Sequence, residues 1–444
     1  MENLNVYGQP VTLKHILKFA VPTIAMTVFM SFYTMVDGLF VSNLIGTDAL
    51  SAINLTAPVI QLVTAISTML ATGGSAVIMK KMGEHREKEA KEDFTFLILV
   101  NVLAGFLMCG IGYFAVGRVF AGMGLSADVT GYCVEYLSLY LPFIVPILLM
   151  NNFTLYMIAS GKAALSLVCS VAGGVLNMAL DYVFLAVCGF GIGGAAVATG
   201  LGYSVTAAAG LFVFSGKKNL LHFTKPALRF RVLLHAASNG CSEMATALVT
   251  GIVTMMFNWT MLRYVGENGV AAVTIIMYVL MFASSLYTGY SCGVAPMISF
   301  YYGEKNHEKL TKLTAVSLKV IACISVVTVA ASFILTKPLV SVFARPHNPV
   351  YGLAVTGNRI CTIALVFIGF NIFASGLFTA LSNGVVSAIL AFSRSFVCML
   401  AAMLILPVFL GVNGIWLATP AAEFTALLLS AGMFLKYRKK YGYL

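Results

Sequence analysis

Long apolar runs recur along the whole chain, separated by short polar stretches. A helix that crosses the hydrocarbon core of a bilayer needs roughly 20 apolar residues. Only helices or closed barrels satisfy every backbone group in lipid, and runs of this length predict helices. Twelve such runs are present, at residues 15–41, 51–78, 93–116, 130–157, 163–187, 193–214, 231–258, 269–298, 311–335, 350–379, 385–408 and 412–435. We therefore predict an all-α integral membrane protein with twelve transmembrane helices.

The composition excludes a soluble globular protein. Hydrophobic residues make up 60% of the 444 residues and charged residues only 10%, whereas a soluble protein has roughly 25% charged residues. The 9 cysteines form no CxxC pair, which argues against a zinc site or a disulfide framework. No phosphate-binding loop, metal motif or nucleophile–base pair is visible either. We therefore expect that the protein binds no cofactor and is not an enzyme.

The basic residues predict the orientation of the chain in the membrane. With the N-terminus in the cytoplasm, the outer loops receive only Arg118, Arg263, Lys337 and Arg345. Of the 27 basic residues, 20 lie on the inner side, and three more lie within spans, namely Lys319, Arg359 and Arg394. The positive-inside rule then places both termini in the cytoplasm. It also accounts for the net charge of +11 without a nucleic-acid partner.

The second half of the chain repeats the first at one constant offset. The segments and glycines that match are 44–53 with 264–273, 191–199 with 411–419, Gly73 with Gly293, and Gly83 with Gly303. Because each repeat holds six spans, both repeats enter the membrane from the same side. In transporters built this way the substrate path lies between the halves. We expect an N-terminal lobe over 1–214, a cytoplasmic linker over 215–230 and a C-terminal lobe over 231–444.

Polar residues in the N-terminal half form a candidate cation site. Tyr33 precedes Asp37 by one helical turn, and Asn177 precedes Asp181 by one turn, so each pair shares a helix face. With Thr199 of the sixth helix, these residues fall in the outer half of the membrane. Acids inside a membrane are functional hypotheses by default. The two carboxylates would take a proton or, with Asn177 and Thr199, bind Na⁺ as a metal site. The alternative is a fixed polar network that holds helices together.

Other polar positions suggest a hinge and a substrate cavity. Pro22 interrupts the first helix and permits a kink there. Glu243, near the middle of the seventh helix, would attract a cationic substrate, or it is a carboxyl kept neutral by hydrogen bonds. Glu423 and Arg394 lie on adjacent spans and are expected to pair. Three residues form a polar stripe on the second helix, namely Gln61, Thr64 and Thr68. Such a stripe is typical of a cavity wall or of hydrogen bonding between helices.

The sequence resembles the multidrug and toxic compound extrusion (MATE) transporters along nearly its whole length. The similar segments are AVPTIAMTVFMSFYTMVDGLFVSNLIG (20–46), GVLNMALDYVFL (174–185) and GVAPMISFYYGEKN (293–306). In one branch of that family, the N-lobe site combines a first-helix Tyr and Asp, a fifth-helix Asn-x-x-x-Asp and a sixth-helix Thr. The matching residues here are Tyr33, Asp37, Asn177, Asp181 and Thr199, with the kink-forming Pro22.

A second branch of the family relies more on acids of the C-terminal lobe. Glu243 is similar to its seventh-helix Glu, but the tenth-helix Asp of that branch is absent here. The resemblance thus implies a V-shaped pair of six-helix bundles that exports organic cations in exchange for H⁺ or Na⁺. It also implies a monomer in the lipid bilayer of a bacterial cytoplasmic membrane.

The nearest alternative function is a lipid-linked saccharide flippase of the related fold superfamily. Such a protein would need a cationic cavity for a diphosphate, whereas the buried charge here is mainly acidic.

Overall fold

The computed structural model of the chain describes the backbone of residues 5–44, 47–122 and 126–443. It describes side chains over residues 7–36, 52–122 and 126–443.

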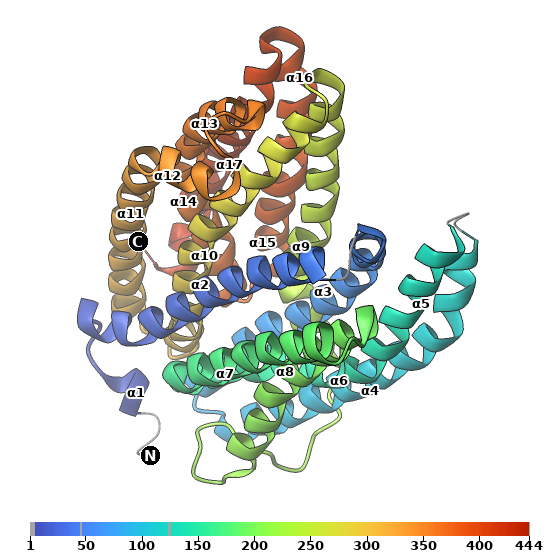
Figure 1. Cartoon of the computed structure of the whole chain (residues 1–444). Helices are drawn as coiled ribbons and strands as arrows, with labels where there is room; N and C mark the ends of the chain where they lie inside the picture. The colour runs from blue at the N-terminus through green and yellow to red at the C-terminus, as the bar shows by residue number, and fades with distance from the viewer. Residues whose placement is uncertain (1–4, 45–46, 123–125, 444) are drawn as a thin grey trace. The chain divides into compact units, whose positions relative to one another are not determined.

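Every regular element in these residues is a helix (Figure 1). The first half contains α1 (Asn5–Gly8), α2 (Leu13–Leu44), α3 (Thr47–Gly83), α4 (Glu87–Ala121), α5 (Ala127–Tyr140), η2 (Leu141–Phe143), α6 (Ile144–Ala159), α7 (Ala163–Asp181), η3 (Tyr182–Val187) and α8 (Gly191–Ser215). The second half contains α9 (Phe230–Tyr264), α10 (Glu267–Gly303), α11 (His307–Ile334), α12 (Thr336–Phe343), α13 (Pro349–Cys361), η4 (Thr362–Ala364), α14 (Leu365–Ala380), α15 (Gly384–Phe392), η5 (Ser393–Cys398), α16 (Met399–Leu410) and α17 (Val412–Tyr441). Within the described residues, 12 helical segments are long and apolar enough to cross a membrane. The prediction of an all-α protein with twelve spans is confirmed.

Polar caps mark where several of these helices begin. The side chains of Ser126, Asn306 and Asn383 each accept a hydrogen bond from the backbone N–H three residues later. A cap of this kind satisfies one of the four N–H groups that a helix leaves unpaired at its start. The apolar runs thus set where the chain lies in lipid, and these short polar residues set where a helix starts.

The duplication seen in the sequence is also present in the backbone. His85 and Lys305 both adopt a left-handed conformation, with φ of 59° and 57°, and Gly191 and Gly411 do so with φ of 59° and 58°. Both pairs are related by the offset that the sequence repeat predicts. The 3₁₀ turns η2 and η4 interrupt the fourth and tenth spans at nearly the same offset. Because left-handed backbone is uncommon outside glycine, its recurrence at His85 and Lys305 shows that both repeats end their second helix in the same turn.

The chain divides into two compact units, and two of the boundaries between them fall inside helices, one in α2 and one in α9. Unit 1 comprises 1–9 and 29–240, and unit 2 comprises 10–28 and 241–444. Two helices are therefore shared between the units. The first part of α2 belongs to unit 2, and the first part of α9 belongs to unit 1.

Close helix packing explains the assignment of α2. In unit 2, a methyl group at Gly293 of α10 would lie 2.9 Å from Ala20 Cα, so the two helices meet backbone to backbone. The Thr27 hydroxyl donates a hydrogen bond to the Ser285 carbonyl at 2.8 Å. Small residues that let helices approach closely are the usual means of association in lipid. They hold the first part of α2 on α10.

The equivalent contact in unit 1 holds the first part of α9. A methyl group at Gly73 of α3 would lie 2.7 Å from the backbone nitrogen of Gly240. Gly73 corresponds to Gly293, and Gly240 to Ala20, at the offset of the sequence repeat. Each repeat therefore places the start of its first helix against the second helix of the other repeat.

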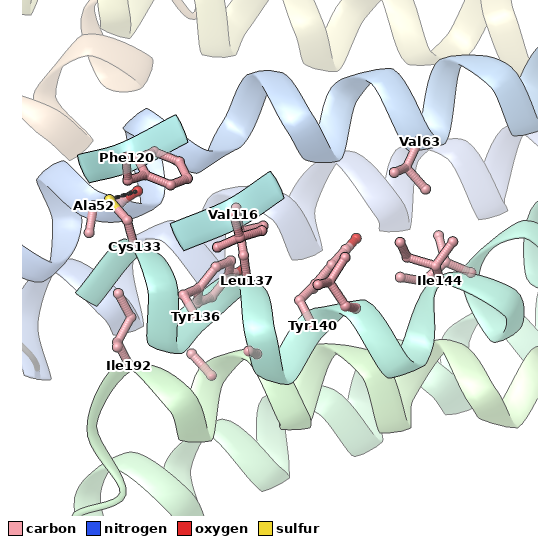
Figure 2. Close-up of a cluster of buried hydrophobic side chains, with 14 of the residues drawn as sticks. Ala52, Val63, Val116, Phe120, Cys133, Tyr136, Leu137, Tyr140, Ile144 and Ile192 are labelled. Atoms are coloured by element: carbon pink, nitrogen blue, oxygen red, sulfur yellow. Dashed lines mark hydrogen bonds between the residues drawn. The ribbon is translucent and has the colours of Figure 1, made fainter. Parts of the chain in front are cut away.

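An apolar cluster in unit 1 packs α3, α4, α5, α6 and α8 together (Figure 2). Tyr140 and Ile144 are both 2% exposed. The Cys133 thiol donates to the Ala52 carbonyl at 3.8 Å. In lipid, where tails are as apolar as the protein surface, such a cluster holds helices by packing rather than by exclusion of water.

A charged network fixes the segment between α8 and α9. Asp93 of α4 is fully buried, and its carboxylate accepts hydrogen bonds from the side chains of Lys81 and Arg229. Arg229 also donates to Glu92 at 2.6 Å, and the Thr224 N–H donates to Thr95 at 3.0 Å. The segment that follows α8 is thereby bound to unit 1 through α4.

We predict that Gly240→Ala destabilises the protein by about 1–3 kcal/mol, the usual cost of inserting a methyl group into a well-packed interior. The added methyl would meet the Met69 backbone, which cannot yield as a side chain does. Thermal unfolding of the purified protein in detergent measures this loss. The control is Gly110→Ala on α4, where the added methyl has no neighbour within 4 Å. Equal unfolding temperatures for the two variants would contradict the proposed close packing.

Candidate cation and substrate sites

The N-terminal candidate site is built on the facing sides of α7 and α8. Asn177 and Asp181 lie one turn apart on α7 and are 1% and 0% exposed. The Asn177 Nδ2 donates a hydrogen bond to the Thr199 hydroxyl of α8 at 3.3 Å. The structure thus brings Asn177 and Thr199 together within unit 1. Asp37 lies in α2, but its side chain is outside the described residues.

Two glycines let α7 and α8 approach closely enough for this contact. A methyl group at Gly202 would lie 2.7 Å from Asn177 Cβ, and one at Gly173 would lie 2.6 Å from the Gly202 carbonyl oxygen. Neither position therefore tolerates a side chain without moving a helix. The small residues bring Asn177 of α7 within hydrogen-bonding distance of Thr199 of α8.

Tyr33 borders a small cavity beside these residues. The cavity measures about 10 Å³ and is lined by Met30, Tyr33, Met150, Ser170, Gly173, Gly174, Gly202, Tyr203 and Thr206. That volume is about the room one water molecule needs. Gly173 and Gly174 precede Asn177 by about one turn, so the cavity and the polar pair occupy neighbouring positions on α7.

The chemistry of the N-terminal site is that of oxygen donors in an apolar surrounding. Asn177 Oδ1 is buried and accepts no hydrogen bond from the described residues. The Asp181 carboxyl is fully buried in a span. A carboxylate, an amide oxygen and a hydroxyl are the ligands that hard cations prefer, and the same carboxylate accepts a proton when no metal ion is present.

The C-terminal unit contains the pair that the sequence predicted between Arg394 and Glu423. Arg394 Nε donates to both carboxylate oxygens of Glu423, at 2.8 and 3.0 Å. Asn371 Nδ2 donates to Glu423 Oε2 at 2.8 Å, and Asn371 Oδ1 accepts a hydrogen bond from Ser430 at 2.9 Å. Glu423 is therefore held from two sides.

The helix that carries Arg394 is irregular at this residue. Arg394 lies in η5, a π-helical turn between α15 and α16. Such turns are rare overall and occur often at functional sites. No signal in the sequence predicted a π-turn at this position.

The other residues predicted for the substrate cavity and the hinge belong to two different units. Thr64 and Thr68 donate to carbonyls four residues earlier on α3, at 3.1 and 2.9 Å, and Gln61 is exposed. In unit 2, Glu243 of α9 is half-buried. Pro22 lies within α2, in the part that belongs to unit 2.

Sequence reasoning gave no structural role to Asp93. It lies at the predicted start of the third span, where an acid is typical of a polar boundary. Its full burial depends on Arg229, which is 136 residues away in the chain, and local patterns carry no information about such a partner.

Twelve apolar spans in a duplicated fold, with buried acids inside spans of both units, define a polytopic membrane transporter. Residues 22–183 and 244–404 match the family model described as MatE. The match covers more than half of the chain, and the chain therefore belongs to the MatE family. It is a transporter rather than an enzyme.

Relatives of similar length are known among bacterial exporters. The multidrug export protein MepA of Staphylococcus haemolyticus is 22% identical over 445 residues, covering 98% of this chain and 96% of that protein. MepA of Staphylococcus saprophyticus is 20% identical over 420 residues, covering 94% and 90%.

Solved structures share the fold. A MATE transporter in complex with MaL6 matches with a TM-score of 0.92 and 23% identity, covering 99% of this chain and 98% of that chain. A MOP superfamily transporter from Pyrococcus furiosus matches with a TM-score of 0.90 and 22% identity, with the same coverage. At these identities the likeness shows the fold alone.

We predict that Glu423→Leu destabilises the protein by about 3–5 kcal/mol, because it leaves the Arg394 charge in the protein interior without its acid. The double variant Arg394→Leu/Glu423→Leu removes both charges and is expected to lose clearly less stability. Thermal unfolding in detergent compares the two. A double variant less stable than Glu423→Leu would show that the pair is not energetically coupled.

Proposed function

We propose that this MATE-family transporter is a secondary antiporter that exports organic cations from the cytoplasm in exchange for H⁺ or Na⁺. The observation that carries the proposal is the fully buried Asp181 beside the Asn177–Thr199 pair on α7 and α8. The known relatives are named multidrug export proteins, which supports drug-like substrates.

The coupling step we infer takes place at the N-terminal site. Asp37 and Asp181 bind a proton, or a Na⁺ ion with Asn177 and Thr199, and Tyr33, which borders the small cavity against α7, belongs to the same site. Antiport requires only that the ion and the drug prefer different conformations of the protein. When the acids are ionised, the lobe has high affinity for the drug. When the coupling ion is bound, that affinity falls and the drug is released.

We infer that α2 transmits this change. Its first part is held on α10 by Gly293 and Thr27, and its later part reaches α7, where a methyl group at Gly174 would lie 2.7 Å from Phe29. Pro22 leaves one backbone carbonyl without its helical partner, which supports bending of α2 there. Glu243, Gln61, Thr64 and Thr68 are proposed to line the substrate cavity.

We also propose that the lobes comprise residues 1–214 and 231–444, joined by a cytoplasmic linker over 215–230. The protein would act as a monomer in a bacterial cytoplasmic membrane with both termini inside. The asymmetry of the basic residues supports this orientation.

Ethidium efflux from vesicles tests the antiport proposal. Wild type and the variants Asp37→Asn and Asp181→Asn are compared under separately imposed pH and Na⁺ gradients. We expect one gradient to drive efflux in wild type. In each variant, the stimulation of efflux by that gradient should be at least about fivefold smaller, the factor that corresponds to the lower end of usual coupling energies.

The matched control for this test is Glu267→Gln, which removes an exposed acid at the start of α10. It is expected to keep full efflux. Full gradient-driven efflux by Asp181→Asn would contradict the proposed role of the N-terminal site.

Labelling of Cys188 tests the orientation. This cysteine is exposed and lies in the turn before α8, which the proposed orientation places outside. A membrane-impermeant maleimide should label it in intact cells, and Cys188→Ser should lose that label. Labelling of Cys188 only after lysis would reverse the orientation.

A further inference from the structure

The last helix of the second repeat continues past the point where its counterpart in the first repeat ends. Ser215 is the last residue of α8, and Leu435 corresponds to it at the offset of the sequence repeat. Beyond Leu435, α17 runs on for six residues to Tyr441. The added residues are Lys436, Tyr437, Arg438, Lys439, Lys440 and Tyr441. The extension therefore places four cations at the end of the second repeat.

Within the described residues, no acid forms an ion pair with these four cations, and their side chains are exposed. The described ion pairs of unit 2 lie elsewhere, at Lys309 with Glu304 and at Arg394 with Glu423. The first repeat differs, because its basic residues Lys81, Arg86 and Lys91 pair with acids. Since paired cations also satisfy the positive-inside rule, orientation alone does not explain why the cations of α17 have no acid beside them.

Three of the four cations share one face of the helix. Lys436, Lys439 and Lys440 have the spacing i, i+3 and i+4, which makes them neighbours on the helix surface. The ammonium groups of Lys436 and Lys440 each lie 5.7 Å from the centre of the Tyr437 ring. Like charges at this spacing destabilise a helix. An anion that contacts this face would relieve the repulsion.

The residues that follow hold the end of this helix on unit 2. Gly442 has a φ of 63°, which lets the chain turn back, and Tyr443 is fully buried. The Tyr443 hydroxyl donates a hydrogen bond to the Phe434 carbonyl at 2.7 Å. The Thr311 hydroxyl of α11 donates to the Gly442 carbonyl at 3.2 Å. Cations on a helix end that is already held in place lose little freedom when they bind a partner.

The length of α17 brings these cations to the level of lipid headgroups. Lys436 and Lys440 lie about 36 and about 42 Å along the helix from Val412, its first residue. The hydrocarbon core is about 30 Å thick, and the bilayer with its headgroups is about 40–45 Å thick. The tyrosines of the extension fit the same level, since tyrosine is enriched at membrane–water interfaces.

We propose that Lys436, Lys439 and Lys440 form a basic face that binds the phosphate headgroups of anionic phospholipids in the cytoplasmic leaflet. Clusters of four or more basic residues directly cytoplasmic of a span are typical of anionic-lipid binding. The choice of leaflet rests on the proposed orientation, which the labelling of Cys188 tests separately. The basic face gives the C-terminal unit a contact that depends on the charge of the membrane.

Native mass spectrometry of the purified full chain in an uncharged detergent tests the basic face. Phosphatidylglycerol and phosphatidylcholine with the same acyl chains are added separately, and the Kd of the first bound molecule is measured for each. We expect wild type to bind phosphatidylglycerol at least about tenfold more tightly, since each basic residue near an anionic surface contributes about fivefold. Lys436→Gln/Lys439→Gln/Lys440→Gln should raise the Kd for phosphatidylglycerol about tenfold and leave that for phosphatidylcholine within about twofold.

Two matched variants separate the basic face from a change in net charge. The first removes three exposed lysines of unit 1 that are predicted to lie on the same side of the membrane, and it should keep the lipid preference. It is Lys88→Gln/Lys217→Gln/Lys225→Gln. The second keeps the charges and should bind both lipids as wild type does. It is Lys436→Arg/Lys439→Arg/Lys440→Arg. No variant should unfold at a lower temperature than wild type without lipid, because the replaced side chains are exposed.

Equal loss of phosphatidylglycerol binding in the two glutamine variants would overturn the proposal, because net charge alone would then explain the binding. Displacement of phosphatidylglycerol by an equal concentration of inorganic phosphate would also overturn it, since the basic face would then bind a free anion.

The measurement uses neither a drug nor an ion gradient, so its outcome is independent of antiport. Lipid preference that depends on the basic face, without gradient-driven efflux, would retain this proposal and reject antiport. Efflux without such a preference would do the reverse. Labelling of Cys188 only after lysis would overturn the cytoplasmic leaflet and retain the binding of headgroups.

Discussion

The reciprocal exchange of helix starts is the constraint on which the rest of the structure depends. The first part of α2 packs on α10 through Gly293, and the first part of α9 packs on α3 through Gly73. Each repeat is therefore complete only when the other supplies the beginning of a helix. Neither contact tolerates a side chain, because in both the neighbour is backbone rather than the flexible end of a residue.

Lipid imposes the second constraint, because it offers no hydrogen bonds to a polar group that lacks a partner. Hydroxyls such as those of Thr64 and Thr68 therefore donate to their own helix. Acids deep in spans either have partners, as Glu423 has, or are expected to have a function. Among the described residues, few charged side chains are buried, and they include Asp93, Asp181 and Glu423.

Much of the fold could be predicted from the sequence because apolar length and repeat offset are local or periodic signals. They gave the twelve spans and the duplicated turns. The pairing of Arg394 with Glu423 was also predictable, since the two lie on adjacent helices. The division of α2 and α9 was not, because it depends on contacts such as Thr27 with Ser285, 258 residues apart. For the candidate site, one-turn spacing predicted the shared face of Asn177 and Asp181. The approach of Thr199 depended on Gly202, whose role only the helix packing reveals.

The exchanged helix starts also bear on how the protein is made. A ribosome delivers residues 10–28 to the membrane long before α10 exists, so this segment must wait in lipid for a partner that is synthesised only after the whole first repeat. The start of α9, by contrast, finds α3 already in place. Biogenesis is therefore asymmetric although the finished repeats are alike. A gene split at the linker would yield two polypeptides that each begin with a segment belonging to the other.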